Sequence, residues 1–307
     1  MCVHKEMTDL DRLQKTIIPS GRISMVLDTD AYNEIDDQFA ILYALLSPDR
    51  IDLQAVYAAL YYNQRSNSPE DGMELSYQEI CKILKFLEKN PDGFAFRGCK
   101  NPIKDRSSPE SSEAVEDLIL RARARTSDNP LYVVGIGACT NLANAILLAP
   151  DILEKVVAVW LVGNSYDWHD HSEFNLSQDQ LAAAIIFDSG VPLIQVPAHG
   201  VTGFLITSIY ELEACIGNAN PICDYLIENV RLYETDHFAW GKPIWDVGVI
   251  GMLVNNDWVK MKTVPSPFFT EAGLYSHYSH RHLIRCVSSM NRDKIFKDMF
   301  HKLRNCK

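Results

Sequence analysis

Residues 23–43 (ISMVLDTDAYNEIDDQFAILY) constrain the fold more than any other part of the chain. A short apolar run at 23–27 leads into Asp28 and Asp30, and Asp36 and Asp37 then precede a second apolar segment. The first run is typical of a buried parallel strand, and the second is typical of a helix. Four carboxylates therefore gather where a strand ends and a helix begins, which is the edge at which open α/β sheets bind ligands.

Mutual repulsion limits how these four aspartates can coexist. Carboxylates a few ångströms apart cannot all stay ionised unless a positive charge lies among them or some hold a proton. Ca²⁺ and Mg²⁺ suit the position because both prefer oxygen ligands. Asp36 and Asp37 have a second explanation as helix N-terminal charges, each stabilised by about 0.3–1 kcal/mol. That explanation is weaker for Asp28 and Asp30, because unpaired charge at the end of a buried strand is costly.

Strand and helix patterns alternate along most of the chain, which predicts an α/β fold with a mostly parallel central sheet flanked by helices. Further strands are expected at 51–60, 94–97, 131–137, 156–164 and 191–197, and helices at 74–89, 113–125, 139–149 and 178–189. Residues 203–255 are expected to be mainly helical, followed by strands at 258–263 and 282–287 and a helix at 292–303. We find no repeat and no linker, so we expect one α/β domain over 1–307, with 1–21 as an N-terminal arm.

Bulk composition narrows the classes of partner. The formal net charge of −11 argues against binding nucleic acid through phosphate contacts. No apolar run approaches the roughly 18–20 residues of a membrane span, and the polar start lacks the apolar core of a signal peptide. The 8 cysteines include no C-x-x-C pair, which favours reduced thiols and a cytoplasmic location. We therefore expect a small-molecule ligand, with no nucleic acid and no membrane.

Three later segments are expected to return to the first cluster, because each follows a strand or opens a helix. They are GIGACTN at 135–141, SEFN at 172–175 and PIWD at 243–246. The two glycines of the first segment indicate a tight turn or a close backbone approach, since the full dinucleotide-binding fingerprint is absent. His169 and His171 form a His-x-His pair that suits zinc, although a polar loop is the more common explanation.

Together these segments resemble the inosine–uridine-preferring nucleoside hydrolase family, in order from about residue 22 to 304. The family motif D-x-D-P-G-x-D-D is similar to DTDAYNEIDD at 28–37, and a family Gly-Asn turn is similar to Tyr62-Asn63. The family motifs P-T-G-x-L-T-N, A-E-F-N, E-S-G-V-P and H-D-P are similar to the segments at 135–141, 172–175, 188–192 and 245–247.

The resemblance implies Ca²⁺-dependent hydrolysis of the N-glycosidic bond of a ribonucleoside or related riboside, which releases ribose and base. By position, the calcium ligands would be Asp30, Asp37, the backbone carbonyl of Ile136, and Asp246. Asp30 would also act as general base on a metal-bound water. Calcium fits the oxygen-only donor set that the aspartates indicate. The family's habit further implies a homodimer or homotetramer.

The resemblance also implies which residues hold the riboside. Asp36, Asn63, Glu173 and Asn175 match positions that bind ribose hydroxyls, and Asp28 matches a supporting residue behind the site. The transition state would resemble an oxocarbenium ion, which anionic side chains around the ring stabilise.

Three departures from the family pattern concern the spacing between Asp30 and Asp36 and the handling of the leaving base. The first motif carries two extra residues and lacks Pro-Gly, and residues 98–112 contain no histidine where many members have a histidine- and glycine-rich loop. Trp245 stands where the family has a histidine that contributes to leaving-group handling. Tryptophan stacks on a base but donates no acidic proton. Replacement acids remain open among four residues: His169, His171, Tyr275 and His280.

Two other functions fit part of the pattern. A haloacid dehalogenase-type phosphatase also begins with a strand ending in D-x-D, but it needs a distant acidic pair, and no G-D-x-x-x-D follows here. A non-catalytic, calcium-dependent riboside-binding protein is the other alternative, because the loops that handle the base have changed. Turnover of a riboside or of an aryl phosphate distinguishes the three.

Overall fold

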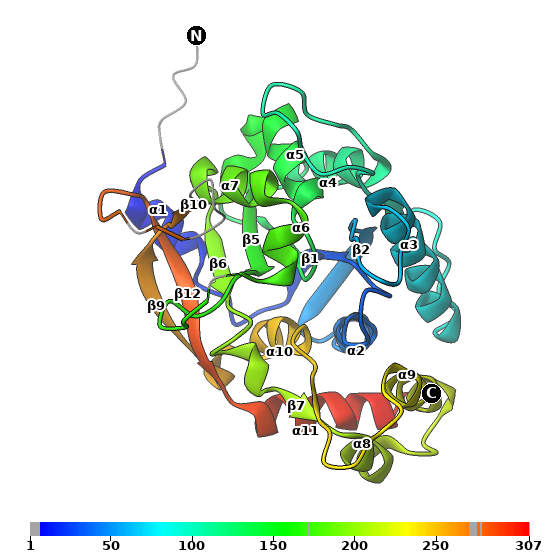
Figure 1. Ribbon diagram of the computed structural model, residues 1–307. Helices are drawn as coiled ribbons and strands as arrows, with labels where there is room; N and C mark the ends of the chain where they lie inside the picture. Colours follow the sequence, from blue (N-terminus) through cyan, green and yellow to red (C-terminus); the bar gives the residue numbers. More distant parts are fainter. Residues whose placement is uncertain (1–6, 171, 270–274, 277, 307) are drawn as a thin grey trace.

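The computed structural model describes residues 7–170, 172–269, 275–276 and 278–306 (Figure 1). Its main feature is an 8-stranded sheet in the order β3-β2-β1-β4-β5-β6-β12-β9. The strands are β1 (Ile23–Thr29), β2 (Ile51–Ala58), β3 (Ala95–Arg97), β4 (Leu131–Gly135), β5 (Val156–Leu161), β6 (Leu193–Val196), β9 (Val259–Pro265) and β12 (Leu283–Met290). Neighbouring strands pair in parallel except for β12 with β9 at one edge. The predicted mostly parallel sheet is confirmed.

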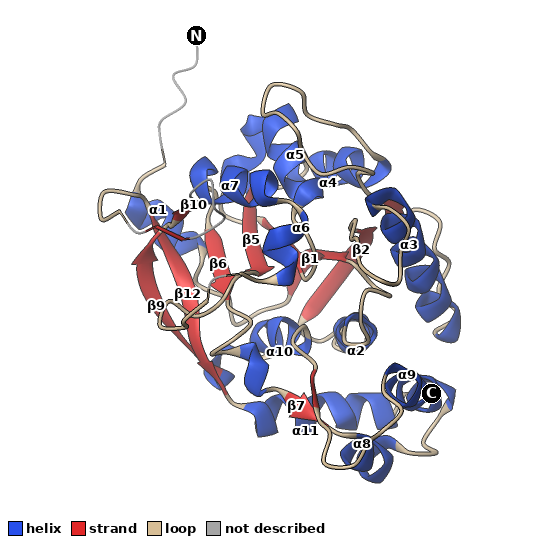
Figure 2. Cartoon of the chain, in the orientation of Figure 1, coloured by secondary structure: helices blue, strands red, loops and turns tan. Residues whose placement is uncertain are grey.

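Helices cover both faces of this sheet (Figure 2). One face carries α4 (Glu113–Arg123), α5 (Thr140–Leu148) and α7 (Gln180–Ser189), and the other carries α2 (Asp37–Leu45), α3 (Pro69–Phe86), α10 (Val247–Val254) and α11 (Arg292–Arg304). The remaining elements are α1 (Asp9–Lys15), α6 (Phe174–Gln178), α8 (Ile209–Ile216), α9 (Pro221–Tyr233), β7 (Ile206–Thr207), β8 (Lys242–Pro243), β10 (Phe268–Phe269), β11 (Tyr275–Ser276) and three short 3₁₀ segments, 150–155, 202–204 and 256–258.

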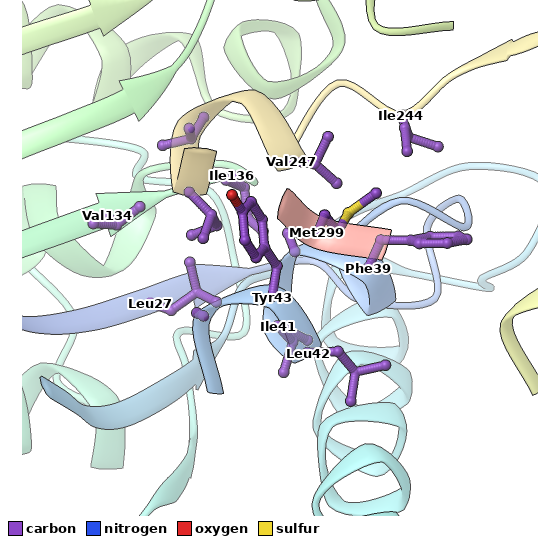
Figure 3. Close-up of a cluster of buried hydrophobic side chains, with 14 of the residues drawn as sticks. Leu27, Phe39, Ile41, Leu42, Tyr43, Val134, Ile136, Ile244, Val247 and Met299 are labelled. Atoms are coloured by element: carbon purple, nitrogen blue, oxygen red, sulfur yellow. The ribbon is translucent and has the colours of Figure 1, made fainter. Parts of the chain in front are cut away.

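The core is divided by the sheet into two apolar clusters. Successive side chains of a strand point to opposite faces, so Val26 of β1 packs with α4, α5 and α7, whereas Leu27 packs with α2 and α10. Figure 3 shows the second cluster, in which Phe39 and Tyr43 of α2 lie beside Val247 of α10 and β1. The strand and helix that carry the aspartates are therefore anchored by buried packing.

Two regions differ in detail from the expected elements. The helix expected at 178–189 is α7, which begins at Gln180, and the separate short helix α6 precedes it. Asp179 caps α7: its carboxylate accepts hydrogen bonds from the backbone N–H of Ala182 (2.9 Å) and from Thr140 Oγ1 (2.8 Å). The N-terminal arm contains the short helix α1, in which Arg12 Nε donates to the carbonyl of Gly190 (2.8 Å). Across the residues described, no helix combines the length and apolar character that a membrane span requires.

Candidate active site

A cavity of about 350 Å³ opens at the carboxyl-terminal edge of the parallel strands. Residues that follow β1, β2, β4, β5 and β6 all reach it, as expected for a ligand site in an open α/β sheet. Its walls contain Asp30, Asn33, Glu34, Asp36, Asp37, Asn63, Gln64, Ile136, Leu161, Ser172, Glu173, Phe174, Asn175, Ala198, His199, Trp245 and Asp246.

An acidic cluster forms the floor of this cavity. Carboxylate oxygens of Asp36, Asp37 and Asp246 lie within 4.8 Å of one another. Asp36 and Asp246 occupy the N-cap positions of α2 and α10, yet neither side chain makes a capping hydrogen bond. A capping role therefore does not account for these carboxylates, which leaves their oxygens available to a ligand. The positive ends of both helix dipoles point toward the cluster.

Burial is the main cause of the raised pKa values in this cluster and in Asp30, which lines the same cavity. It lifts the pKa of Asp30, Asp37 and Asp246 well above the ordinary range, and the neighbouring carboxylates add to the effect. Burial also raises the pKa of Asp36 to about 6, although the Lys242 ammonium opposes the rise. The four aspartates offer only oxygen atoms as ligands, and their mutual repulsion would be relieved by a positive charge among them. A hard divalent cation fits both features.

Lys242 and Glu34 form a charged pair beside the cluster. The Lys242 ammonium donates to a Glu34 carboxylate oxygen, and only 9% of the Lys242 side chain is exposed. Although burial disfavours its charge, Asp36 and Glu34 raise the pKa of Lys242. One cation thus offsets part of the negative charge, but three further carboxylates still lack a partner of opposite sign among the described residues.

The loop between Asp30 and Asp36 is held by side chains from the turn after β2. Asn33 Nδ2 donates to Asp30 Oδ2 (3.1 Å), and Asn63 Nδ2 donates to Asn33 Oδ1 (2.6 Å). Arg65 Nη1 donates to the carbonyls of Tyr32 and Glu34, each at 3.0 Å. The extra residues of the first motif therefore form a braced loop, and Asp30 and Asp36 still reach one cavity.

Glu173 and Asn175 are fixed by backbone contacts around β5. Glu173 accepts hydrogen bonds from the backbone N–H groups of Gly163 (3.0 Å), Asn175 (2.9 Å) and Leu176 (3.1 Å), while burial raises its pKa to about 7. Asn175 Nδ2 donates to the carbonyls of Ile136 (3.1 Å) and Leu161 (2.9 Å). A carbonyl oxygen has two lone pairs, so that of Ile136 retains capacity for a cation.

The glycine-containing segment after β4 allows close approach to Asp30. A Cβ atom added to Gly137 would lie 2.9 Å from the Asp30 carboxylate, so a larger residue would displace it. Asp28 lies behind the cavity, where its Oδ1 accepts from Asn141 Nδ2 (2.8 Å). Burial raises the pKa of Asp28 to about 7.

The mouth of the cavity is aromatic. The Trp245 ring lies against Gly203, at which a Cβ would come within 2.9 Å of Trp245 Cζ3. His199 stands edge-to-face with Trp245, with ring centroids 5.0 Å apart, and stacks on Trp168 at 5.2 Å. An apolar, flat wall of this kind suits a planar ring.

All the predicted site residues except Asp28 line this cavity: Asp30, Asp36, Asp37, Asn63, Ile136, Glu173, Asn175, Trp245 and Asp246. Of the four candidate acids, His169 and His280 do not line it. His171 and the side chain of Tyr275 lie outside the described residues. The sequence interpretation missed Asn33, Lys242 and His199. Only His199 carried a usable signal, because it closely follows a predicted strand.

The sequence profile of the inosine-uridine preferring nucleoside hydrolase family matches residues 25–296. The chain is 29% identical over 157 residues to the pyrimidine-specific ribonucleoside hydrolase RihB of Escherichia coli and to its putative counterpart in Shigella boydii. Each match covers 49% of this chain, together with 50% of the first relative's length and 64% of the second's.

Solved structures of low sequence identity share the fold. A plant nucleoside hydrolase superimposes with a TM-score of 0.75 at 19% identity, covering 94% of this chain and 100% of that chain. A purine-preferring ribonucleoside hydrolase from Gardnerella vaginalis gives a TM-score of 0.72 at 18% identity, covering 92% of this chain and 98% of that chain.

Proposed function

Because this chain belongs to the inosine-uridine preferring nucleoside hydrolase family, we propose that it hydrolyses the N-glycosidic bond of a ribonucleoside or related riboside. The observation that carries the proposal is the cavity in which Asp30, Asp36, Asp37 and Asp246 converge beneath an aromatic mouth. The products would be ribose and the free base.

We propose Ca²⁺ as the cofactor, held by Asp30, Asp37, the Ile136 carbonyl and Asp246. Their raised pKa values and all-oxygen chemistry support this choice. When bound, the cation would neutralise the carboxylates and lower the pKa of the attacking water. Asp36 lies close enough to Asp37 and Asp246 to contribute to the same site.

Asp30 is the proposed general base. Its carboxylate accepts a hydrogen bond from Asn33, which fixes its orientation, and it would take the proton that water loses on attacking the sugar. General-base catalysis of this kind contributes about 10²–10⁴-fold. Oxocarbenium character develops on the sugar ring, and the surrounding carboxylates stabilise that positive charge.

Ribose recognition is assigned to Asp36, Asn63, Glu173 and Asn175, all of which line the cavity. Glu173 and Asn175 are held rigidly by backbone hydrogen bonds, so little side-chain entropy would be lost on binding. Trp245 would stack on the base at the cavity mouth.

The first experiment measures ribose release from a panel of purine and pyrimidine nucleosides and from 4-nitrophenyl riboside. Each substrate is run with Ca²⁺ and again with a chelator. Release that disappears with chelator and returns with calcium is the expected result. Calcium-dependent binding without any release would instead identify a riboside-binding protein, and release of phosphate from an aryl phosphate would favour a phosphatase.

We further propose a homodimer or homotetramer in a reducing compartment, the cytoplasm. The seven described cysteines are free thiols, which supports the compartment. Sedimentation of the purified protein tests the oligomeric state.

A further inference from the structure

Departure of a nucleobase requires a proton or a strong hydrogen bond at the base. When the C1′–N bond breaks, its electron pair goes to a base nitrogen, and an anionic base is a poor leaving group at neutral pH. The residue immediately before the N-cap of α10 is Trp245, which lines the cavity but whose indole N–H supplies no acidic proton. A donor to the base must therefore come from a residue other than Trp245.

His199 occupies that position. It is the one histidine among the described residues that line the cavity, and it follows β6 on the turn at 197–202. His199 is an exposed residue, so a ligand entering the cavity from solvent can reach it. Its ring contacts two aromatic rings, those of Trp168 and of Trp245, and Trp245 lines the same cavity.

The backbone of His199 is fixed on both sides. Its N–H donates to Asn164 Oδ1 (3.0 Å), and its carbonyl accepts from the N–H of Ser165 (2.9 Å). Asn164 is buried and its Nδ2 donates to the carbonyls of Asp170 (2.9 Å) and Ser172 (3.0 Å). Gly200 makes the turn possible with a φ of +86°, in the left-handed region that favours glycine.

The imidazole ring is also restrained. It stacks on Trp168 with an angle of 7° between the ring planes and meets Trp245 at 83°. A base that stacks on Trp245 would therefore lie beside an imidazole whose position is already set. Such preorganisation is what a proton donor to a departing group needs.

We propose that His199 is a catalytic residue that donates a proton to the leaving base, an assignment that rests on the proposed hydrolase function. The C1′–N bond breaks, the base nitrogen receives the electron pair and a proton from the protonated imidazole, and water adds its oxygen to C1′. Asp30 takes the proton released by that water. Solvent then returns a proton to His199 and removes one from Asp30, so the net reaction consumes one water molecule.

The test compares substrates whose leaving groups differ in their need for a proton. Nitrophenolate leaves without protonation, whereas hypoxanthine and uracil do not leave readily as anions. In H199Q, we expect kcat on inosine or uridine to fall by about 10²-fold or more, with 4-nitrophenyl riboside changed less than about threefold. H169Q is the matched control, because His169 also contacts Trp168 (5.4 Å) but does not line the cavity.

The outcomes separate this inference from the function on which it rests. Equal loss on both kinds of substrate in H199Q, or no loss on either, would overturn the role of His199 while leaving the hydrolase assignment intact. If the unaltered protein released ribose from none of the substrates, the proposed function would fail, and the inference with it. An unchanged Tm in H199Q excludes general unfolding as the cause of any loss.

Discussion

Asp246 lies at a position that suits either a helix-capping residue or a metal ligand. It occupies the N-cap of α10, where an aspartate commonly bonds to a backbone N–H of the first turn, but its side chain makes no such bond. Its carboxylate instead lies in the cluster with Asp36 and Asp37.

Replacement of Asp246 by asparagine is expected to weaken calcium binding by about 10- to 100-fold or more, since loss of even an outer partner commonly has that effect. The fold should persist, because the substitution removes a repelling charge and creates no cavity. Isothermal calorimetry gives the affinity, with D257N at an exposed aspartate as control. Unchanged affinity in D246N would show that the ligand assignment is wrong.

Asp30 supports a second prediction at this scale. D30N keeps the shape of the side chain but cannot accept a proton, so kcat on 4-nitrophenyl riboside is expected to fall by about 10²–10⁴-fold. Steady-state kinetics at saturating Ca²⁺ measure the loss. A D30N variant with nearly full turnover would exclude Asp30 as the general base.

The loop that joins β1 to α2 acts as a unit. Arg65 lies 5.1 Å from the Tyr32 ring and 5.5 Å from the Tyr233 ring, and it also binds two loop carbonyls. Tyr32 has a φ of 90°, an uncommon conformation for a residue with a side chain. The braces from Arg65 and Asn63 hold the loop in this conformation.

Replacement of Arg65 by alanine is expected to lower kcat/KM on ribosides between about 10- and 100-fold, because small misplacements of Asp36 are costly to catalysis. Hydrolysis kinetics test this, and R22A, on an exposed arginine, provides the control. R65K should recover only part of the activity, since lysine lacks the planar fork. Full activity in R65A would show that the loop needs no brace.

Buried carboxyl groups make the stability of the whole molecule depend on pH. Burial raises the pKa of Asp28 and Glu173 to about 7, above the values near 4 expected in the unfolded chain. Between about pH 4 and 7 the folded state therefore binds more protons than the unfolded state. Stability consequently falls as the pH rises through this window.

Without calcium, the protein is expected to melt at least about 2–4 °C lower at pH 7.5 than at pH 5. Calcium should raise the Tm more at pH 7.5, where protons compete less for the carboxylates. Thermal unfolding with chelator and with Ca²⁺ measures both effects. E173Q removes one titrating group and should reduce the pH difference, whereas an identical difference in E173Q would contradict this contribution of Glu173.

The sequence by itself determined the parallel sheet, the family and the position of the acidic cluster. These follow from local patterns: apolar runs of strand length, helical spacing, and polar residues placed where strands end. Asp30, Asn63 and Glu173 were identifiable because parallel strands bring their carboxyl ends to one edge, whatever the details of packing.

Only the tertiary structure decided which neighbours surround those residues. Lys242 approaches Glu34 and Asp36 from more than 200 positions away in sequence, and no local pattern encodes such a pairing. The same is true of His199, whose ring is placed by Trp168 and Trp245 from two other loops. Side-chain contacts between distant segments depend on how loops fold back over the sheet, and that geometry is set by packing rather than by periodicity.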